Sequence, residues 1–225
     1  MEDILDLYQA TPAADTVYLA IDEKGKELQK EVRETVPMQE GQVKRYDSEY
    51  QRQGSCNLFV AYNWHTHQRH ILVSERRRGE DWGQFLGYLA EQVYPSAKRI
   101  VVVCDNLNIH DTASLYEVYE AERARAIAKR IEFHYTPVHA SWLNMAEIEL
   151  SALERQCLGR RLGEVAEVAK QAAAYEQARN AKGIGIKWQF STEQARVKLG
   201  RAYPSGEGKR VSGGVVENEV QLTLF

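Results

Sequence analysis

Three acidic residues of this chain have the type and placement that divalent-metal chemistry needs. Asp22 follows the apolar run 17–21, and Asp105 follows a second apolar run, 100–104. Glu147 lies in a later segment with helical periodicity. Carboxylates at the ends of buried strands repel one another and lose hydration, so folding alone gives little reason for them. A pair of magnesium ions gives such a reason, and the pattern predicts a metal-dependent phosphoryl-transfer domain that acts on nucleic acid.

The elements that must position these acids are predicted from the hydrophobic pattern. We expect strands at 17–22, 27–32, 57–63, 70–74, 100–104 and 131–136, a turn at Glu23–Lys26, and an irregular stretch over 33–54. We expect helices at about 81–93, between His110 and Lys129, from Asn144 to about Gly159, at about 164–181 and at about 191–202. Strands followed by strand–helix alternation predict an α/β domain with a mixed sheet.

Composition restricts the class of protein. The chain has 225 residues, of which 44% are hydrophobic, and this suits one domain with a core of its own. A formal net charge of −3 is unusual for a nucleic-acid-binding protein and predicts either local basic patches or a separate basic module. No bilayer-spanning stretch or signal peptide is evident. The three separated cysteines, Cys56, Cys104 and Cys157, favour reduced thiols in a cytoplasmic protein. We expect a short lead over 1–15, the domain over 16–203, and a disordered tail over 204–225.

Helical geometry selects the third acid. At about 100° per residue, one apolar stripe of this helix comprises five residues, Leu143, Ala146, Leu150, Leu153 and Cys157. Glu147 lies at the edge of that stripe, whereas Glu149 lies well off it. Glu147 is therefore expected to face the sheet. Glu154, one to two turns later on the same side, is the reserve candidate.

Each acid also has an alternative explanation. Asp22 could start a turn, and Asp105 could cap the loop before the next helix. Glu147 could be the third-position glutamate of a capping box that begins at Asn144. The coincidence of all three favours the metal hypothesis, because two ions about 3.5–4 Å apart activate the attacking oxygen and stabilise the leaving oxygen at phosphorus. Magnesium requires the hard oxygen ligands that Asp and Glu supply.

Two motifs around these acids closely resemble the catalytic core of bacterial insertion-sequence transposases, in particular insertion-sequence family 630 of the mariner-like superfamily. The motifs are Val103–His110 (VCDNLNIH) and His134–Glu147 (HYTPVHASWLNMAE), and the likeness extends to Ala20–Lys24 and Ile186–Leu199. It covers about residues 16–204. The resemblance implies a ribonuclease-H-like fold with a five-stranded mixed sheet flanked by helices. It also implies that Asp22, Asp105 and Glu147 form the DDE acidic triad and bind two Mg²⁺ or Mn²⁺ ions. The implied activity is cleavage at transposon ends followed by strand transfer into target DNA.

The family normally carries helix-turn-helix modules ahead of this domain, whereas here Asp22 lies only 21 residues after Met1. We therefore expect a truncated element, a split reading frame or a domesticated remnant. The expected partners are DNA, a separate helix-turn-helix protein and a second copy of the chain in a homodimer, with no membrane. Two alternatives remain open. One is a catalytically silent DNA-binding or assembly remnant, and the other is a related structure-specific nuclease or ribonuclease H.

Seven further residues are candidate DNA contacts: Lys24, Arg76, Arg77, Arg78, His110, His139 and Trp142. The lysine could contact the scissile phosphate or occupy the predicted turn, and the arginines could bind phosphates or form solvated surface. The two histidines could orient phosphate or water, or make structural hydrogen bonds. The tryptophan could stack on a base or pack in the core. His65, His67 and His70 are predicted to form a solvated turn rather than a metal cluster.

Overall fold

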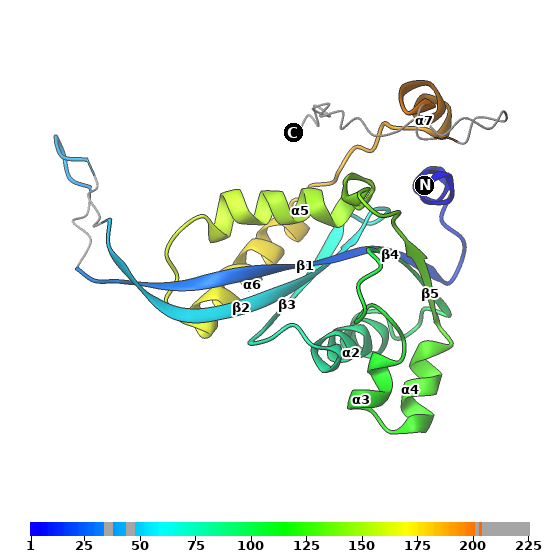
Figure 1. Ribbon diagram of the computed structural model, residues 1–225, viewed down its shortest axis with the longest axis horizontal. Helices are drawn as coiled ribbons and strands as arrows, with labels where there is room; N and C mark the ends of the chain where they lie inside the picture. The colour runs from blue at the N-terminus through cyan, green and yellow to red at the C-terminus, as the bar shows by residue number, and fades with distance from the viewer. Residues whose placement is uncertain (34–37, 44–47, 201–202, 204–225) are drawn as a thin grey trace.

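The computed structural model describes residues 1–33, 38–43, 48–200 and 203. Its centre is a five-stranded sheet with the order β3-β2-β1-β4-β5 (Figure 1). The strands are β1 Thr16–Glu31, β2 Tyr50–Asn63, β3 Gln68–Ser74, β4 Arg99–Cys104 and β5 Ile131–Tyr135. β1 pairs antiparallel with β2, and β2 with β3, whereas β1 pairs parallel with β4, and β4 with β5. The predicted mixed sheet is thereby confirmed.

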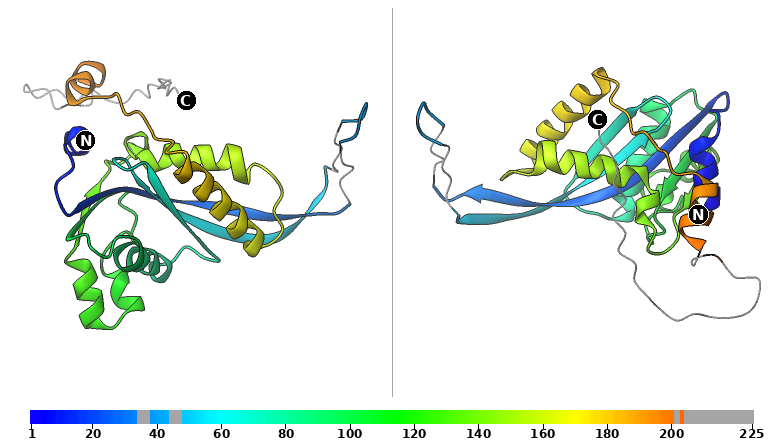
Figure 2. Two further views of the ribbon diagram at one scale, coloured as in Figure 1. Left: turned by 180° about the vertical axis from the view of Figure 1, so that it is seen from behind. Right: turned by 90° about the horizontal axis from the view of Figure 1, so that it is seen from above.

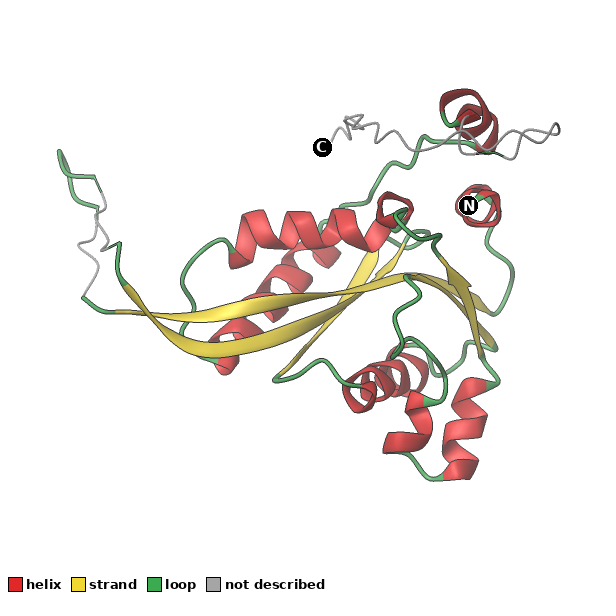
Figure 3. Ribbon diagram, in the orientation of Figure 1, coloured by secondary structure: helices red, strands yellow, loops and turns green. Residues whose placement is uncertain are grey.

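Helices cover both faces of this sheet (Figures 2 and 3). They are α1 Glu2–Gln9, α2 Gly79–Tyr88, α3 Ser114–Val118, α4 Ala121–Ala128, α5 Met145–Leu153, α6 Val165–Ala181 and α7 Thr192–Lys198. The π-helical turns η1 Leu89–Val93 and η3 Glu154–Leu158 extend α2 and α5, and the 3-10 turn η2 Ser141–Leu143 precedes α5. The helices α2 to α4 lie on one face, and α5 and α6 lie on the other. In the described ranges, no helix combines the length and apolar character that a membrane span requires.

Alternation along β1 divides its side chains between the two layers. Leu19 and Ile21 are fully buried in the cluster beneath α2. Tyr18 and Ala20 are buried in the cluster beneath α5. Because side chains two apart share a face, Asp22 projects toward the α5 layer.

The turn predicted at Glu23–Lys26 is wrong, because β1 continues without interruption through these residues. Glu23 pairs with Phe59 and Gly25 pairs with Asn57 on β2. This ladder satisfies the backbone of the segment, so strand pairing overrides the local preference of a Lys-Gly sequence for a turn. β2 also begins earlier than predicted, at Tyr50. The rest of the irregular stretch falls partly outside the described residues. The end of the last predicted helix, 201–202, and the predicted disordered tail, 204–225, lie outside them.

The helix α1 is an element that the sequence pattern did not predict. Ile4, Leu5 and Tyr8 are buried on its inner face. The Tyr8 hydroxyl donates to the Leu143 carbonyl at 2.7 Å, immediately before α5 begins. The N-terminal segment therefore fixes the position of the helix that carries Glu147.

We expect Tyr8→Phe to lower the free energy of unfolding by about 1–2 kcal/mol, because the Leu143 carbonyl loses a buried hydrogen-bond donor. Tyr116→Phe is the matched control, since the Tyr116 side chain is 50% exposed and its change should stay within about 0.5 kcal/mol. Chemical denaturation of the three proteins measures both values. Equal effects of the two substitutions would show that the Tyr8 hydroxyl does not fix α5.

Candidate active site

Two of the predicted acids lie just beyond the last pair of the parallel ladder between β1 and β4. That ladder ends with Ala20 opposite Val103. Asp22 and Asp105 each follow this pair by two residues, so both come from the same edge of the ladder. Asp22 is inside β1 rather than at its end, which corrects the predicted strand boundary. The two strands are neighbours and run parallel, which is the arrangement that brings both acids to one edge.

Asn144 brings the start of α5 to this edge. It is the N-cap of α5, and its Oδ1 accepts a hydrogen bond from the Ala146 backbone N–H at 3.1 Å. Its Nδ2 donates to the Ile21 carbonyl at 2.9 Å and to Asp22 Oδ2 at 3.3 Å. Glu147 follows in the first turn and is half-buried. The sequence identified Asn144 only as a possible cap, because its bonds to β1 depend on the tertiary fold.

The predicted acids disfavour one another's charged forms. Burial raises the pKa of Asp22 to about 7, and the charges of Glu147 and Asp105 add to the rise. A hydrogen bond of 2.8 Å from the Glu23 backbone N–H to Asp22 Oδ1 opposes it. Burial also raises the pKa of Glu147, while Lys24 lowers it and Asp105 raises it further. Negative charge from three separate elements therefore meets at this edge.

The donor chemistry of this edge fits a hard divalent cation, because all three acids offer carboxylate oxygens. Asp105 Oδ1 is buried and accepts no well-aligned hydrogen bond among the described residues, although it lies 2.6 Å from His110 Nδ1. The aligned contact of that ring nitrogen is with the Asp105 carbonyl at 3.0 Å. Within the described ranges, no three His, Cys, Asp or Glu side chains gather closely enough to hold one ion. The acids thus share a neighbourhood without forming a closed set of ligands.

Glu23 supports this edge from the opposite face of β1. Its side chain is 3% exposed, and its Oε2 lies 3.0 Å from His110 Nε2. The buried ring of His110 packs on Trp82, with ring centroids 4.2 Å apart. Burial opposes the charged form of His110, but the hydrogen bonds and charges of Glu23 and Asp105 outweigh it and raise the pKa. These contacts agree with the alternative in which His110 makes structural hydrogen bonds. Glu23 was missed because β1 was predicted to end one residue earlier.

The arginines predicted to contact DNA are exposed at the start of α2. Arg77 Nη1 lies 3.3 Å from Glu23 Oε1, which links this surface to the buried His110 network. Arg78 is the N-cap residue of α2 and lies 3.8 Å from Glu80. Arg76 is the third exposed member, and its backbone carbonyl accepts a hydrogen bond from a serine hydroxyl.

The remaining single candidates have different surroundings. Lys24 is half-exposed and lies 3.8 Å from Glu154, the reserve acid. His139 is exposed and has a left-handed backbone, with φ of 62°. Trp142 packs edge-on against Phe190, with ring centroids 5.4 Å apart, as its core-packing alternative predicts.

His65 and His67 lie between β2 and β3, whereas His70 lies in β3, and all three are half-buried rather than fully solvated. His67 Nδ1 lies 3.1 Å from the Tyr62 hydroxyl, and His70 Nδ1 lies 3.7 Å from Glu176. Each ring therefore has its own neighbour, and the predicted solvated turn is only partly correct.

Glu149, which lies well off the apolar stripe expected for α5, is nevertheless buried. Its carboxylate lies 2.9 Å from Arg69 Nε and 3.3 Å from Arg179 Nε. The Tyr175 hydroxyl donates to it at 2.8 Å. The helix is covered on two sides, so a single apolar stripe could not reveal which polar residues lie inside.

Asp22→Asn should stabilise the metal-free protein at neutral and alkaline pH. The native pKa of about 7 lies above the ordinary value of 3.8, so ionisation of Asp22 destabilises the fold increasingly between these values. The variant should therefore match wild type near pH 4 and exceed it by about 1–3 kcal/mol in free energy of unfolding near pH 8. Denaturation in EDTA across this range measures the difference.

The matched control for this prediction is Asp15→Asn, which removes the same charge from a side chain that is 55% exposed. A difference between wild type and Asp22→Asn that did not change with pH would contradict the raised pKa of Asp22.

Comparison with known proteins bears on this geometry. A protein-family model described as DDE superfamily endonuclease matches residues 17–169. No curated protein matches the chain. Among solved structures, the chain is similar to the crystal structure of the Mos1 strand transfer complex, with a TM-score of 0.54 and 15% identity over 81% of this chain and 54% of that chain.

Two further Mos1 structures are similar. The Mos1 mariner paired end complex with Mn gives a TM-score of 0.51 and 18% identity, and the Mos1 transposase paired-end complex with the left transposon end gives 0.52 and 16%. Each match covers 81% of this chain, which spans 55% of the length of either Mos1 chain. At these identities the likeness concerns the fold, and the expected ribonuclease-H-like architecture is confirmed. Because the family model matches more than half of its residues, the chain belongs to the DDE superfamily endonucleases.

Proposed function

We propose that this domain is the catalytic domain of a metal-dependent DNA transposase, which cuts DNA at transposon ends and transfers the cut strand into target DNA. The observation that supports this most strongly is that Asp22 and Asp105 follow the same pair of the β1–β4 ladder, and that Asn144 holds the start of α5, which carries Glu147, at this edge in a DDE superfamily endonuclease. These acids come from three separate elements, and the repulsion between their carboxylates favours cation binding. We therefore assign the three carboxylates as metal ligands.

Two bound Mg²⁺ or Mn²⁺ ions would supply activation of the attacking oxygen and stabilisation of charge at phosphorus. The protein's own contribution is to hold the acids in place. His110 lies 2.6 Å from Asp105 Oδ1, and Asn144 donates to Asp22 Oδ2. Glu23, at 3.0 Å from the other ring nitrogen, orients His110. In this proposal these three residues position the acids and need not contact DNA.

The finer assignment is to insertion-sequence family 630 of the mariner-like superfamily, and the motifs over 103–110 and 134–147 support it. The similar Mos1 structures are a strand transfer complex and paired-end complexes, one with Mn and one with a transposon end. By analogy, we propose transposon ends and target DNA as partners, together with a helix-turn-helix end-binding module and a second catalytic domain, in the cytoplasm. Lys24, Arg76 and Arg78 are the proposed phosphate contacts.

Asp22→Asn, Asp105→Asn and Glu147→Gln should each reduce Mg²⁺-dependent nicking of supercoiled plasmid DNA by on the order of 100-fold or more, the scale for losing one group that stabilises a transition state. Glu154→Gln is the matched control, because it neutralises an acid of the extended α5 helix outside the proposed ligand set. It should retain most of the activity. Gel electrophoresis of nicked and supercoiled plasmid measures the rates.

Equal rates for wild type and Asp105→Asn would reject the assignment. If Glu154→Gln were inactive while Glu147→Gln remained active, Glu154 would be the third ligand instead. A wild-type protein that cuts no DNA even with a helix-turn-helix module supplied would favour the silent binding remnant.

Metal binding should also be visible without catalysis. Millimolar Mn²⁺ should raise the free energy of unfolding of wild type by about 1–3 kcal/mol through mass action, because a cation relieves the repulsion among the acids. Asp105→Asn should gain much less, whereas Glu154→Gln should gain as much as wild type. Thermal denaturation with Mn²⁺ and with EDTA measures the gain. Equal stabilisation of all three proteins would place the binding of Mn²⁺ elsewhere.

A further inference from the structure

A buried cluster between α5, α6 and β3 contains more positive than negative charge. The guanidinium groups of Arg69 and Arg179 share one carboxylate, that of Glu149, at 2.9 and 3.3 Å. The side chains of Arg69 and Glu149 are 0% exposed, and that of Arg179 is 10% exposed. The Tyr175 hydroxyl also donates to this carboxylate and adds no charge. Two cations against one anion leave an excess positive charge in a region from which water is largely excluded.

Arg179 is the less satisfied of the two cations. Arg69 also donates to Asn180 Oδ1 at 3.0 Å and to the Ile184 carbonyl at 2.6 Å. Arg179 Nη2 reaches Glu149 only at 3.5 Å and has no other acceptor among the described residues, and its buried Nε, like that of Arg69, has no well-aligned acceptor there. A guanidinium has several N–H donors, and leaving them unpaired when buried is unfavourable. Arg179 therefore has donors to offer to a further acceptor.

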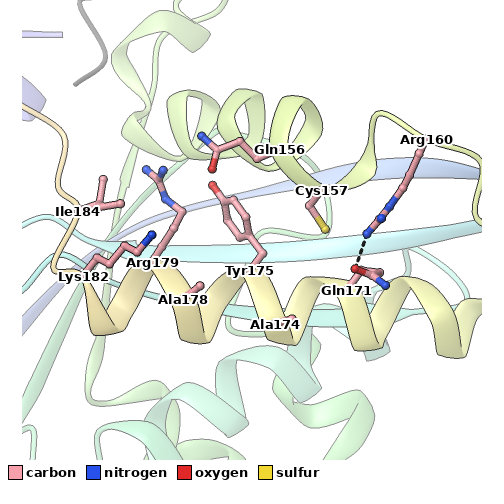
Figure 4. Close-up of a pocket in the computed structure, with 10 residues that line it drawn as sticks. All are labelled: Gln156, Cys157, Arg160, Gln171, Ala174, Tyr175, Ala178, Arg179, Lys182 and Ile184. Atoms are coloured by element: carbon pink, nitrogen blue, oxygen red, sulfur yellow. Dashed lines mark hydrogen bonds between the residues drawn. The ribbon is translucent and has the colours of Figure 1, made fainter. Parts of the chain in front are cut away.

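A cavity of about 300 Å³ lies beside this guanidinium (Figure 4). Figure 4 shows Arg160 at one end of the cavity and Arg179 with Lys182 at the other. Gln156 and Gln171 supply amide groups, and among the residues that the structure describes no Asp or Glu side chain lines the cavity. Arg160 donates to the Gln171 side chain, and Lys182 has no ion pair within the described ranges. The polar lining of this cavity thus consists mainly of cations and amides.

The cavity is separate from the proposed metal ligands. Glu147 and Glu149 are two residues apart on α5, which places them roughly 200° apart around the helix axis. The cluster around Glu149 therefore occupies the face of α5 opposite Glu147. An anion bound there would be distinct from the phosphate that reacts.

We propose that this cavity binds a phosphate group, with Arg179 as the buried anchor and with Arg160 and Lys182 at its rim. Arginine makes charge-assisted hydrogen bonds to phosphate oxygens, often two at once. A phosphate would compensate the excess charge of the Arg69–Glu149–Arg179 cluster. It can come from a nucleic-acid backbone or from a free phosphate. This binding needs neither metal nor cleavage, so it does not depend on the proposed transposase activity.

The test is the double variant Arg160→Ala/Lys182→Ala, which leaves the buried cluster intact. Its matched control is Arg155→Ala/Lys170→Ala, which removes the same two charges from exposed residues of η3 and α6 outside the cavity. All measurements use EDTA. Thermal stabilisation by inorganic phosphate at constant ionic strength reports the free anion, and anisotropy of a labelled DNA duplex across a salt series reports the backbone.

Wild type, the control and Asp105→Asn should bind inorganic phosphate alike, and the cavity variant should bind it at least about tenfold more weakly, a loss matching one charge-assisted contact. If the ligand is a nucleic-acid backbone, the cavity variant should also lower the slope of log affinity against log salt by about 1–2 relative to the control. An unchanged slope with weaker phosphate binding assigns the cavity to a free phosphate. Identical behaviour of the two double variants in both assays would overturn the proposal. Because Asp105→Asn is tested alongside, failure of the metal site and failure of this cavity are distinguishable.

Discussion

The parallel pairing of β1 with β4 is the constraint on which the acidic edge depends. The register that sets Ala20 opposite Val103 also sets the two following acids at the end of one ladder. Five apolar residues of β4 in succession, 100–104, are buried, so the strand has apolar contacts on both faces. A slip of one residue would turn Asp22 toward α2 and Glu23 toward α5. Asp22 and Glu23 therefore lie on opposite faces of the sheet, and the register keeps Asp22 on the α5 side.

Packing of α5 against the sheet brings Glu147 close to Asp22 and Asp105. This packing must therefore overcome the electrostatic repulsion between the carboxylates. At close approach near a protein surface, two carboxylates repel by about 1–4 kcal/mol, and less at greater separation. Leu143 and Leu153 are fully buried, and burying one leucine stabilises by about 1.5–3 kcal/mol. The Asn144 cap and the Tyr8 hydroxyl bond add about 1 kcal/mol each. Apolar contact therefore holds the acids near one another without a cation, so the fold does not require the proposed metal ions in order to form.

The local sequence pattern predicted the structure correctly where one physical effect dominated, and it failed where two effects competed. The apolar run of β4 and the start of α7, where Ser191 forms a capping box, depend on local sequence, and the strand at 100–104 and a helix from about 191 were both predicted. The interruption of β1 at Gly25 was wrong because pairing with β2 outweighs the turn preference of a single glycine. The burial of Glu149 was not predicted, because periodicity reports apolar residues and cannot show a carboxylate that is buried between two arginines. Asn144 and Glu23 gain their roles only through contacts more than 80 positions away in sequence.

The acidic net charge of the chain does not weigh against nucleic-acid binding once the charges are placed. At physiological salt the Debye length is about 8 Å, so a ligand at the surface responds to nearby charges far more than to the net value of −3. The negative edge around Glu147 and the positive cluster around Arg179 lie on opposite faces of α5, with an apolar helix between them. Each group of charges therefore acts mainly on ligands that lie close to it. The negative edge around Glu147 would repel a phosphate backbone until a cation binds there. The positive cluster around Arg179 would attract the backbone without a cation. Such a difference would let DNA associate before the metal centre is complete.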